Sequence, residues 1–372
     1  MSEQTAPPDD GAREGLLPPG FRARALRAQE DVLPEGAIVV TCDAPLGAGG
    51  LGRHLAEIAE AAARGGHDCA TFDAGAVPAR RRGRLWRLLS ARTPVARSIA
   101  TAERFDRGVA AGLPRADSLL AFNRQALAQF AAAGAAGYRH RGLVAASPHA
   151  ALRAERHAAA LRAYPIEESF AAQVPQRLLD EYARADAIYP ASRYTLESFA
   201  DRGFDPGRLP LFPLTPEPRF SPGTQRSDTF DIVYVGALSV AKGVPLLVDA
   251  FRGLDHDDLR LKLVGAPKTR PMRRWLDAAL AADGRMTAAP GDPLPVLRAA
   301  SLCVHPTYED GFAYAPAEAL ACGVPALVSA DTGMSELIER GVSGEVVATG
   351  DLVSLREAID AAYRGDLVRG SR

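Results

Sequence analysis

Two carboxylates, Asp310 and Glu318, flank a short loop in the C-terminal half of the chain. The apolar residues before them are typical of a strand, and Asp310-Gly311 is typical of a turn. Pro316 suits the first turn of a helix and Gly323 the residue just past its end, so the loop would lie at a helix N-terminus. Free N–H groups and the helix dipole favour an anion there. Carboxylates bind hydroxyl groups instead, so the pattern fits a diphosphate joined to polyols, as in a nucleotide-sugar.

The segment 305–325 resembles the signature of the retaining GT-B glycosyltransferases of family 4, also called group 1. In that signature a second Glu follows a first Glu after seven intervening residues. Asp310 stands at the first position, Glu318 at the second, and Ala313 replaces a common Gly. The resemblance implies that Asp310 is a catalytic residue and that the following residues bind the donor: Gly311, Phe312, Ala313 and Glu318. The alternative is an ordinary strand, loop and helix with solvated acids.

A second part of the resemblance follows the strand expected at 231–235. Gly236 and Lys242 fit the family pattern Val-Gly-Arg-Leu-x-x-x-Lys-Gly, in which the lysine meets the donor diphosphate. Gly265 follows the next strand and is expected to border the donor. Ala237 replaces the usual arginine, so one expected positive charge is missing. The sequence leaves open whether Lys242 and helix N-termini carry the charge alone or another arginine reaches in.

A glycine-rich loop, residues 47–52, follows the first expected strand of the chain and matches GxGxxG. Asp73 ends the next strand, as a dinucleotide-binding fingerprint requires, so an NAD(P)- or FAD-dependent oxidoreductase is an alternative function. Against it, five residues separate the strand from the glycines, and the second half carries an independent nucleotide-sugar pattern. The glycosyltransferase resemblance instead implies an acceptor-side loop that approaches the donor diphosphate, with Gly49, Gly50 and Gly52.

His149 lies just past the strand expected at 143–146. Such a position faces the ligand crevice of an open α/β sheet, and the resemblance implies a catalytic His that touches the donor sugar. The alternative is an ordinary loop histidine. Asp255-His256-Asp257 matches the DxD metal motif of the other large glycosyltransferase fold, but it precedes a strand instead of ending one. Turn composition explains it, and we predict no metal site.

Arginines alternate with leucines and Trp86 between Arg80 and Arg92. One interpretation is a patch that meets anionic lipid, which would suit a lipid-linked acceptor. The other is a solvated basic helix whose leucines face the domain core. A glycan or a small molecule is then the expected acceptor.

The elements that must position these residues repeat a strand–helix pattern on both sides of a Pro-rich segment. We predict an α/β protein with two Rossmann-like domains facing across a cleft, the GT-B arrangement. The expected division is a flexible tail at 1–34, an acceptor-side domain at 35–208, a linker at 209–228 and a nucleotide-sugar-binding domain at 229–372. Family members usually continue through helices that cross back onto the first domain, so the coupling of the domains is open.

Composition limits the function classes. The 372 residues carry 44 Lys and Arg against 45 Asp and Glu, which gives no signal for nucleic-acid binding. Four scattered cysteines without metal spacing favour a reduced, cytoplasmic setting, with possible peripheral contact at the membrane face. The first twenty residues lack the apolar core of a signal peptide, and no apolar run reaches the length of a spanning helix.

The combined expectation is a metal-independent, retaining hexosyltransferase that uses a nucleotide-diphospho-sugar as co-substrate and needs no cofactor. Lys242 and the N–H groups of 311–313 would stabilise the leaving diphosphate, while Asp310 orients the sugar hydroxyls. A GT-B-like protein that binds nucleotide-sugar without turnover is a further alternative, which Asp310 and Ala237 favour.

Overall fold

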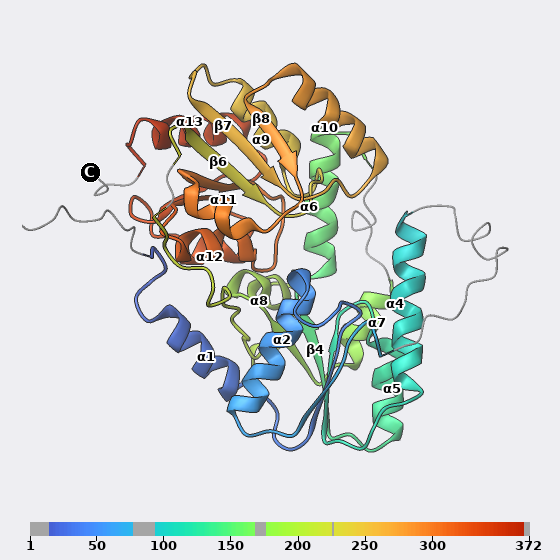
Figure 1. Ribbon diagram of the computed structural model, residues 1–372. Coiled ribbons are helices and arrows are strands. Elements are labelled where there is room, and N and C mark those ends of the chain that lie inside the picture. The colour runs from blue at the N-terminus through green and yellow to red at the C-terminus, as the bar shows by residue number, and fades with distance from the viewer. Residues whose placement is uncertain (1–14, 77–93, 168–175, 225–226, 368–372) are drawn as a thin grey trace, which may run out of the picture.

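The computed structural model describes residues 15–76, 94–167, 176–224 and 227–367. It contains two parallel sheets, with strand orders β2-β1-β3-β4-β5 and β11-β10-β9-β6-β7-β8. Each sheet is covered by helices, and the two domains lie one above the other in Figure 1. The predicted fold class, two α/β domains with parallel sheets, is confirmed.

The first domain is built on apolar strands that are buried because helices cover the sheet. β1, for example, is buried along its whole length between β2 and β3. The strands are β1 Ile38–Thr41, β2 Cys69–Phe72, β3 Ser118–Phe122, β4 His140–Ala145 and β5 Ala187–Pro190. The helices are α2 Gly49–Arg64, α4 Pro94–Ala110, α5 Leu127–Ala135, α6 Ala150–Ala163, α7 Gln176–Arg184, α8 Arg193–Ala200 and the 3-10 helix η2 Pro206–Arg208.

The second domain repeats this construction around the central pair β6 and β9. The strands are β6 Phe230–Val235, β7 Leu259–Val264, β8 Met286–Ala289, β9 Leu302–His305, β10 Ala326–Ser329 and β11 Gly344–Val347. The helices are α9 Val244–Arg252, α10 Arg270–Ala282, α11 Pro293–Ala299, α12 Tyr314–Ala321, the 3-10 helix η3 Gly333–Leu337 and α13 Leu352–Tyr363. The structure therefore places a helix directly after the 305–313 segment, as the sequence predicted.

The N-terminal segment departs from the sequence prediction. Residues 1–34 were expected to form a flexible tail, but Phe21–Asp31 forms helix α1, so the prediction is wrong for this part. α1 packs against α2, where Ala25 and Gln29 are buried. The buried contacts explain the order, since they compensate for the backbone entropy that a free tail would keep.

Contacts near the start of the described chain also reach the second domain. The Leu16 N–H donates to the carbonyl of Leu320, at the end of α12, over 2.7 Å. Leu16 and Leu17 pack against a hydrophobic cluster that contains residues of both domains. The segment 15–31 therefore contacts both domains.

Glu57 of α2 is a half-buried residue that joins four parts of the chain. Its carboxylate accepts hydrogen bonds from Gln29 of α1, from Thr215 of the connecting segment, and from the Tyr314 hydroxyl of α12, at 2.7 to 3.0 Å. The first helix, the linker and the second domain are thus fixed to α2 at one point.

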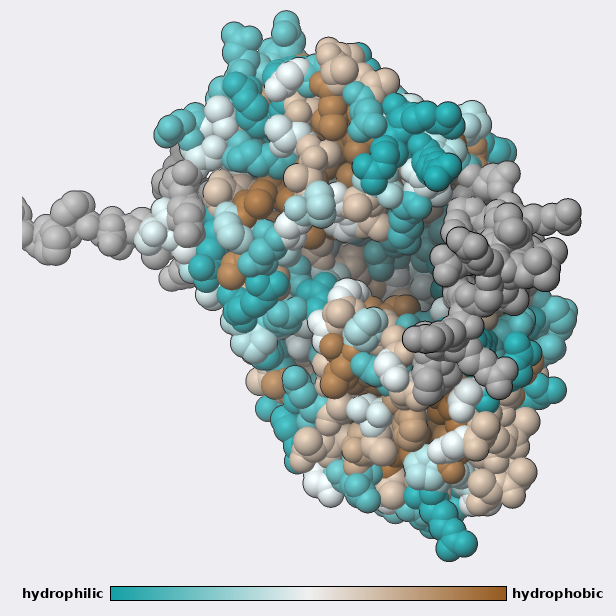
Figure 2. Space-filling view, turned by 45° about the vertical axis from the view of Figure 1, so that its right-hand side comes forward, coloured by the Kyte–Doolittle hydropathy of each residue, from teal (hydrophilic) through white to brown (hydrophobic). Residues whose placement is uncertain are grey.

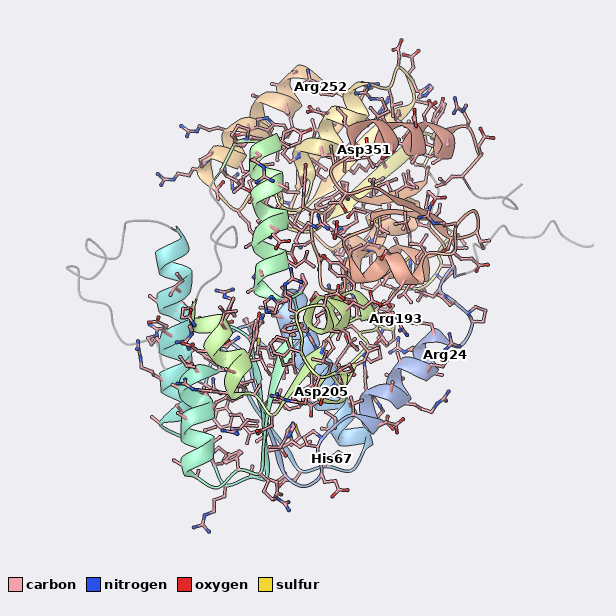
Figure 3. The ribbon with its side chains drawn as sticks, turned by 180° about the vertical axis from the view of Figure 1, so that it is seen from behind. Arg24, His67, Arg193, Asp205, Arg252 and Asp351 are labelled. Carbon is pink, nitrogen blue, oxygen red and sulfur yellow. The ribbon has the colours of Figure 1, made fainter. Side chains whose placement is uncertain are left out.

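Helix α6 leaves the first sheet and runs up beside the second domain (Figure 1). Ala160, near its end, is buried in the apolar cluster of the second domain, and the Tyr164 hydroxyl donates to Asp249 over 3.0 Å. Arg193 of α8 lies at the same junction in Figure 3, and its N–H donates to Glu336 over 3.1 Å. The domains are therefore joined by more than the linker.

The arginine-rich run from Arg80 to Arg92 lies outside the described residues. Among the helices that the structure does describe, none combines the length and the apolar character needed to cross a bilayer.

Candidate functional site

A cavity of about 680 Å³ lies between the two domains. The first domain contributes the loop before α2 and residues just after β4, and the second domain contributes the loops after β6, β7, β8 and β9. Figure 2 shows the hollow between the domains from one side. The carboxyl ends of strands in both sheets thus face one space, which is where open parallel sheets bind ligands. Its volume suits a small organic ligand.

Most of the residues predicted from the sequence line this cavity. They are Gly49, Gly50, Gly236, Lys242, Asp310, Phe312, Ala313 and Glu318. They come from both domains, so the glycine loop and the acidic motif are brought together only by the tertiary structure. Gly52, His149, Gly265 and Gly311 are not among the lining residues.

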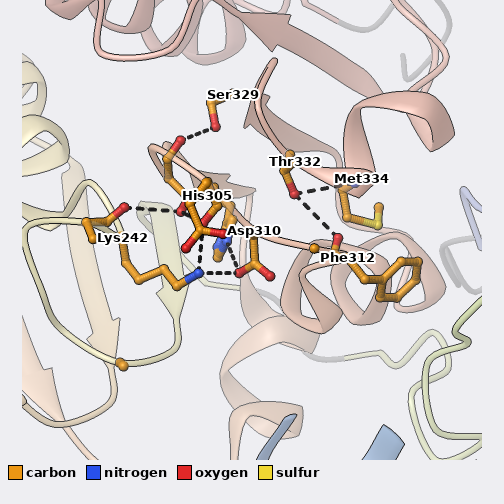
Figure 4. Close-up of polar contacts among 12 residues, drawn as sticks. Lys242, His305, Asp310, Phe312, Ser329, Thr332 and Met334 are labelled. Atoms are coloured by element: carbon orange, nitrogen blue, oxygen red, sulfur yellow. Dashed lines mark hydrogen bonds and ion pairs between the residues drawn. The ribbon is translucent and has the colours of Figure 1, made fainter. Parts of the chain in front are cut away.

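Lys242 and Asp310 form the charged centre of the cavity (Figure 4). The Lys242 ammonium donates to the Asp310 carboxylate over 2.8 Å and to the Glu309 carbonyl over 2.9 Å. His305 Nε2 lies 3.4 Å from the same carboxylate. Burial would raise the pKa of Asp310, but Lys242 and His305 lower it well below its usual value. Asp310 is therefore ionised at neutral pH.

Lys242 is held by the close approach of two loops. Gly243, the next residue, has φ of +70°, and a Cβ there would lie 1.9 Å from the Pro306 carbonyl oxygen. The Tyr308 N–H also donates to Ala241 over 2.9 Å. Glycine at 243 therefore lets the loop after β6 pack on the loop after β9, which brings Lys242 to Asp310.

Glu309 is a buried acid that the sequence reasoning did not single out. Its Oε1 lies 2.8 Å from His157 Nε2 and 3.3 Å from Arg153 Nε, both on α6 of the first domain. Burial would raise the pKa of Glu309, but the charges of Lys242 and Arg153 and the bond to His157 lower it to about 2. Its side chain connects the domains directly behind Asp310. Nothing in the local pattern of α6 indicates these contacts.

Glu318 is fully buried and paired across the cleft. It forms an ion pair with Arg53 of α2, whose guanidinium also lies 3.3 Å from Glu217 and 4.2 Å from the ring centre of Tyr314. Burial raises the pKa of Glu318, and the Arg53 charge offsets only part of this. Arg53 was not predicted as a site residue; its place in the first turns after the glycine loop is the signal that could have identified it.

Two helices begin at the cavity. α2 starts at Gly49 and α12 at Tyr314, and neither has a side-chain hydrogen bond at its N-cap among the described residues. Their first N–H groups are therefore available to an anion from opposite sides of the cleft.

The remaining predicted glycines allow close packing instead of lining the cavity. A Cβ at Gly52 would lie 1.9 Å from the Pro45 carbonyl oxygen, and one at Gly265 would lie 1.9 Å from that of Gly236. A Cβ at Gly311 would lie 2.2 Å from the carbonyl oxygen of Ala146 in the first domain. These glycines lie behind the residues that line the cavity and allow those residues to pack closely.

Asp73, on which the dinucleotide alternative depended, forms hydrogen bonds with nearby backbone groups. Its carboxylate accepts hydrogen bonds from the N–H groups of Leu46 and Gly75, at 3.1 and 2.9 Å. The structure thus gives Asp73 the role of fixing the glycine loop and does not support the oxidoreductase interpretation.

His149 does not support its predicted catalytic role. It is buried and forms the N-cap of α6, where its Nδ1 accepts from the Ala151 N–H over 3.1 Å. Its ring packs against those of Tyr182, Phe199 and Phe204. Burial lowers its pKa to about 4, with the nearby Arg202 as a second cause. The loop after β4 reaches the cavity through Ala146 and Ser147, but the side chain of His149 packs into the aromatic core.

Asp255-His256-Asp257 lies in the connection between α9 and β7, away from the residues that line the cavity. His256 stacks on Tyr363 at 3.9 Å and its Nε2 lies 2.8 Å from Asp360. The described residues contain no group of three or more His, Cys, Asp or Glu side chains arranged to hold a metal ion.

Comparison with known proteins finds a family match for the second domain. Residues 229–364 match the family model described as Glycosyl transferases group 1, the family that the sequence resembles in this segment. The chain is 30% identical over 161 residues to the D-inositol 3-phosphate glycosyltransferase of Salinispora tropica, over 38% of this chain and 33% of that protein. The chain therefore spans about a third of the length of this relative.

Solved structures match most of the chain in fold. The sucrose-phosphate synthase of Thermosynechococcus elongatus matches with a TM-score of 0.70 at 19% identity, over 89% of this chain and 90% of that one. Anabaena HepE in complex with UDP-glucose matches with a TM-score of 0.58 at 16% identity, over 88% and 90%. The fold is GT-B, which confirms the predicted arrangement.

Proposed function

We propose that this protein is a retaining glycosyltransferase that moves a sugar from a nucleotide-diphospho-sugar to an acceptor without a metal. One observation carries the proposal. Lys242, Asp310 and the uncapped N-termini of α2 and α12 line a single cavity in a chain whose second domain matches the group 1 glycosyltransferase family model. An anion-binding centre flanked by carboxylates matches the chemistry of such a donor.

Each part of the donor has a corresponding group in the cavity. The diphosphate lies between Lys242 and the two helix N-termini, and Asp310 accepts hydrogen bonds from the sugar hydroxyls. Glu318 faces the ribose. The bond from the anomeric carbon to the phosphate oxygen breaks, and the charge that develops on the leaving diphosphate is stabilised by these preorganised donors.

The acceptor attacks from the face that the diphosphate leaves, so the configuration is retained. The proton of the acceptor hydroxyl passes to the departing phosphate oxygen, which balances the transfer. This route needs no protein nucleophile behind the sugar. Asp310 serves to orient the sugar, since its interaction with Lys242 keeps it ionised and fixed.

Ligand binding separates the proposal from its alternatives. In a thermal-shift screen we expect UDP-, GDP- or ADP-sugars, but not NAD(P)H or FAD, to raise the melting temperature. Sugar transfer or donor hydrolysis should persist in EDTA. Lys242→Ala should lower the rate by at least ~10²-fold, the usual cost of losing one preorganised contact to developing charge. Stabilisation by NAD(P)H alone, or loss of activity in EDTA that Mg²⁺ or Mn²⁺ restores, would contradict the proposal.

A protein that binds nucleotide-sugar without turnover is the second candidate. Ala237 favours it, because the loop after β6 lacks the cation expected beside the diphosphate. The two candidates differ in the product: NMR of a donor incubated with the protein should show released nucleoside diphosphate and a sugar of unchanged anomeric configuration. Binding with no release over many hours would favour the second candidate.

We further propose an acceptor at the cytoplasmic membrane face, bound through the arginine-rich run from Arg80 to Arg92. Each basic residue near an anionic leaflet contributes about 1 kcal/mol, and Trp86 suits the headgroup depth. Co-sedimentation with anionic vesicles should fall with salt and with Arg80, Arg81, Arg82 and Arg84 changed to Ser. If the wild-type protein stays in the supernatant at low salt, a soluble acceptor, like the inositol phosphate in the name of the Salinispora relative, is the better choice.

A further inference from the structure

The loop after β6 contains a small side chain at a point where the cavity needs positive charge. Ala237 lines the cavity next to Gly236, and the resemblance expects an arginine at this position. Lys242, the nearest predicted cation, is already engaged by Asp310. Because Asp310 already neutralises part of the Lys242 charge, Lys242 alone cannot balance the negative charge of a diphosphate.

The neighbouring loop, after β7, is fastened directly beside this gap. The Leu238 N–H donates to the Ala266 carbonyl over 3.1 Å, and the Lys268 N–H donates back to the Leu238 carbonyl over 3.2 Å. The close approach is possible because Gly265 has no side chain to meet Gly236. The backbone of residue 268 therefore lies next to residue 238, one position from the missing arginine.

Lys268 is an exposed residue at the wall of the same cavity. It lines the wall together with Lys242, and within the described part of the chain its ammonium forms no ion pair. The cavity walls remove part of its hydration and Lys242 repels its charge, so the pKa of Lys268 is lowered. An unpaired cation beside a second cation is electrostatically unfavourable until an anion binds between them.

The position of Lys268 is also fixed from the other side. The next residue, Thr269, donates its hydroxyl hydrogen to Glu167 over 2.6 Å and accepts from the Met272 N–H as the N-cap of α10. Glu167 in turn accepts from the Val240 N–H over 2.8 Å, in the loop after β6. The two loops are thus held as one unit, and Lys268 is preorganised with respect to Lys242.

We propose that Lys268 is the second diphosphate-binding cation of this site and replaces, from the neighbouring loop, the arginine absent at position 237. The inference rests on the proposed nucleotide-diphospho-sugar donor. It places Lys268 beside the phosphate that is farther from the nucleoside. Lys268 should therefore strengthen the binding of nucleoside diphosphates, but not the binding of nucleosides or monophosphates.

Calorimetric titration with the nucleoside diphosphate and monophosphate of the preferred base tests this assignment. Lys268→Ala should weaken diphosphate binding about ten- to a hundredfold, the range for a lost hydrogen bond to a charged group. Monophosphate binding should change by less than about threefold. Arg252→Ala removes a cation from the exposed outer face of the same domain (Figure 3) and is the control, with both affinities unchanged.

A rescue variant separates a ligand contact from general damage. Ala237→Arg combined with Lys268→Ala should recover at least part of the diphosphate preference, because it restores a cation at the position that the resemblance expects. Equal diphosphate binding by wild type and Lys268→Ala would overturn the inference alone. Wild-type protein that binds none of UDP, GDP or ADP would overturn the proposed function as well, so the two failures are distinguishable. Melting temperatures of all variants report whether they are folded.

Discussion

Glu318 is buried against an arginine of the opposite domain, although its sequence pattern predicts a ribose ligand. Arg53 neutralises the carboxylate of Glu318, and burial alone would favour its protonated form. A carboxylate has several lone-pair directions, so it can accept from a ribose while it keeps the guanidinium. The ion pair would then hold Glu318 ionised and oriented for the nucleotide.

We predict that Glu318→Ala weakens binding of the nucleoside diphosphate by about 1.5–3 kcal/mol, the range for hydrogen bonds to a charged partner. Calorimetry measures the loss. Glu217→Ala, which removes the more exposed partner of Arg53, is the control and should change affinity by less than about 1 kcal/mol. Equal affinity of Glu318→Ala and the wild type would show that Glu318 serves only the domain contact.

Glu309 should make stability depend on pH. Its pKa falls from 4.5 to about 2 in the folded protein, since Lys242, Arg153 and His157 outweigh the opposing effect of burial. A depressed folded-state pKa stabilises the fold above the unfolded value, and this contribution is lost as the pH falls from 4.5 towards 2. We therefore expect Glu309→Gln to lower the melting temperature at neutral pH, and the difference from wild type to narrow through this window.

The exposed acid Glu155, which lies 3.6 Å from Arg202, provides the matched control. Glu155→Gln should leave the melting temperature nearly unchanged at every pH, because exposed ion pairs contribute little. A difference between wild type and Glu309→Gln that stays constant from neutral pH to acid would contradict the charge argument and indicate a packing defect.

At the scale of elements, α12 begins in a strained conformation. Its N-cap, Ala313, has φ of +69°, where a Cβ is unfavourable, and the family signature commonly has Gly at this position. The strain is tolerated because neighbouring contacts fix the loop. The carbonyl of the preceding Phe312 accepts from the Thr332 hydroxyl, and Gly311 accepts from Thr195 of the first domain over 3.1 Å. Strain of this kind is common at ligand-binding turns.

We predict that Ala313→Gly stabilises the protein by about 1 kcal/mol, the lower part of the cost of a left-handed L-residue. Ala315→Gly, two residues on in the same helix, is the opposite control and should destabilise by about 0.5–1 kcal/mol, because helical Gly loses more entropy. Chemical denaturation measures both. A loss of stability in Ala313→Gly would mean that packing of its methyl group outweighs the strain.

At the scale of the whole molecule, several of the described segments besides the linker connect the two domains. They include the N-terminal segment 15–31, helices α2 and α6, and the start of α8. Each contact lies beside or behind the cavity, so the relative position of the domains determines whether Arg53 reaches Glu318 and α6 reaches Glu309. The sequence left open how the two domains are coupled. In the structure, segments of the N-terminal half of this chain make the coupling contacts.

We predict that Leu16→Asp with Leu17→Asp lowers the free energy of unfolding by about 1–3 kcal/mol, since both side chains are partly buried against the cluster shared by the domains. Val353→Asp, at an exposed position of α13, is the control and should have little effect. If the double variant unfolds like the wild type, the N-terminal segment does not couple the domains.

The two parallel sheets and the loops that carry the chemistry could be predicted from the sequence. Gly236, Lys242 and Asp310 lie in the loops that follow apolar strands, and the carboxyl ends of parallel strands meet at one edge. Local patterns also located the helix after the acidic loop, since its boundaries depend on residues close in the chain. Each of these elements is formed by residues that are close to one another both in the sequence and in space.

The residue pairs across the cleft and the direction of buried side chains could be seen only in the tertiary structure. Arg53 and Glu318 are 265 residues apart, and His157 and Glu309 are 152 apart, so their contacts depend on how two domains are oriented. His149 follows its strand as predicted, but its own helix and an aromatic core take up the ring. Helix α1 is ordered because it packs against α2. Such outcomes are set by packing between distant elements, which no local pattern encodes.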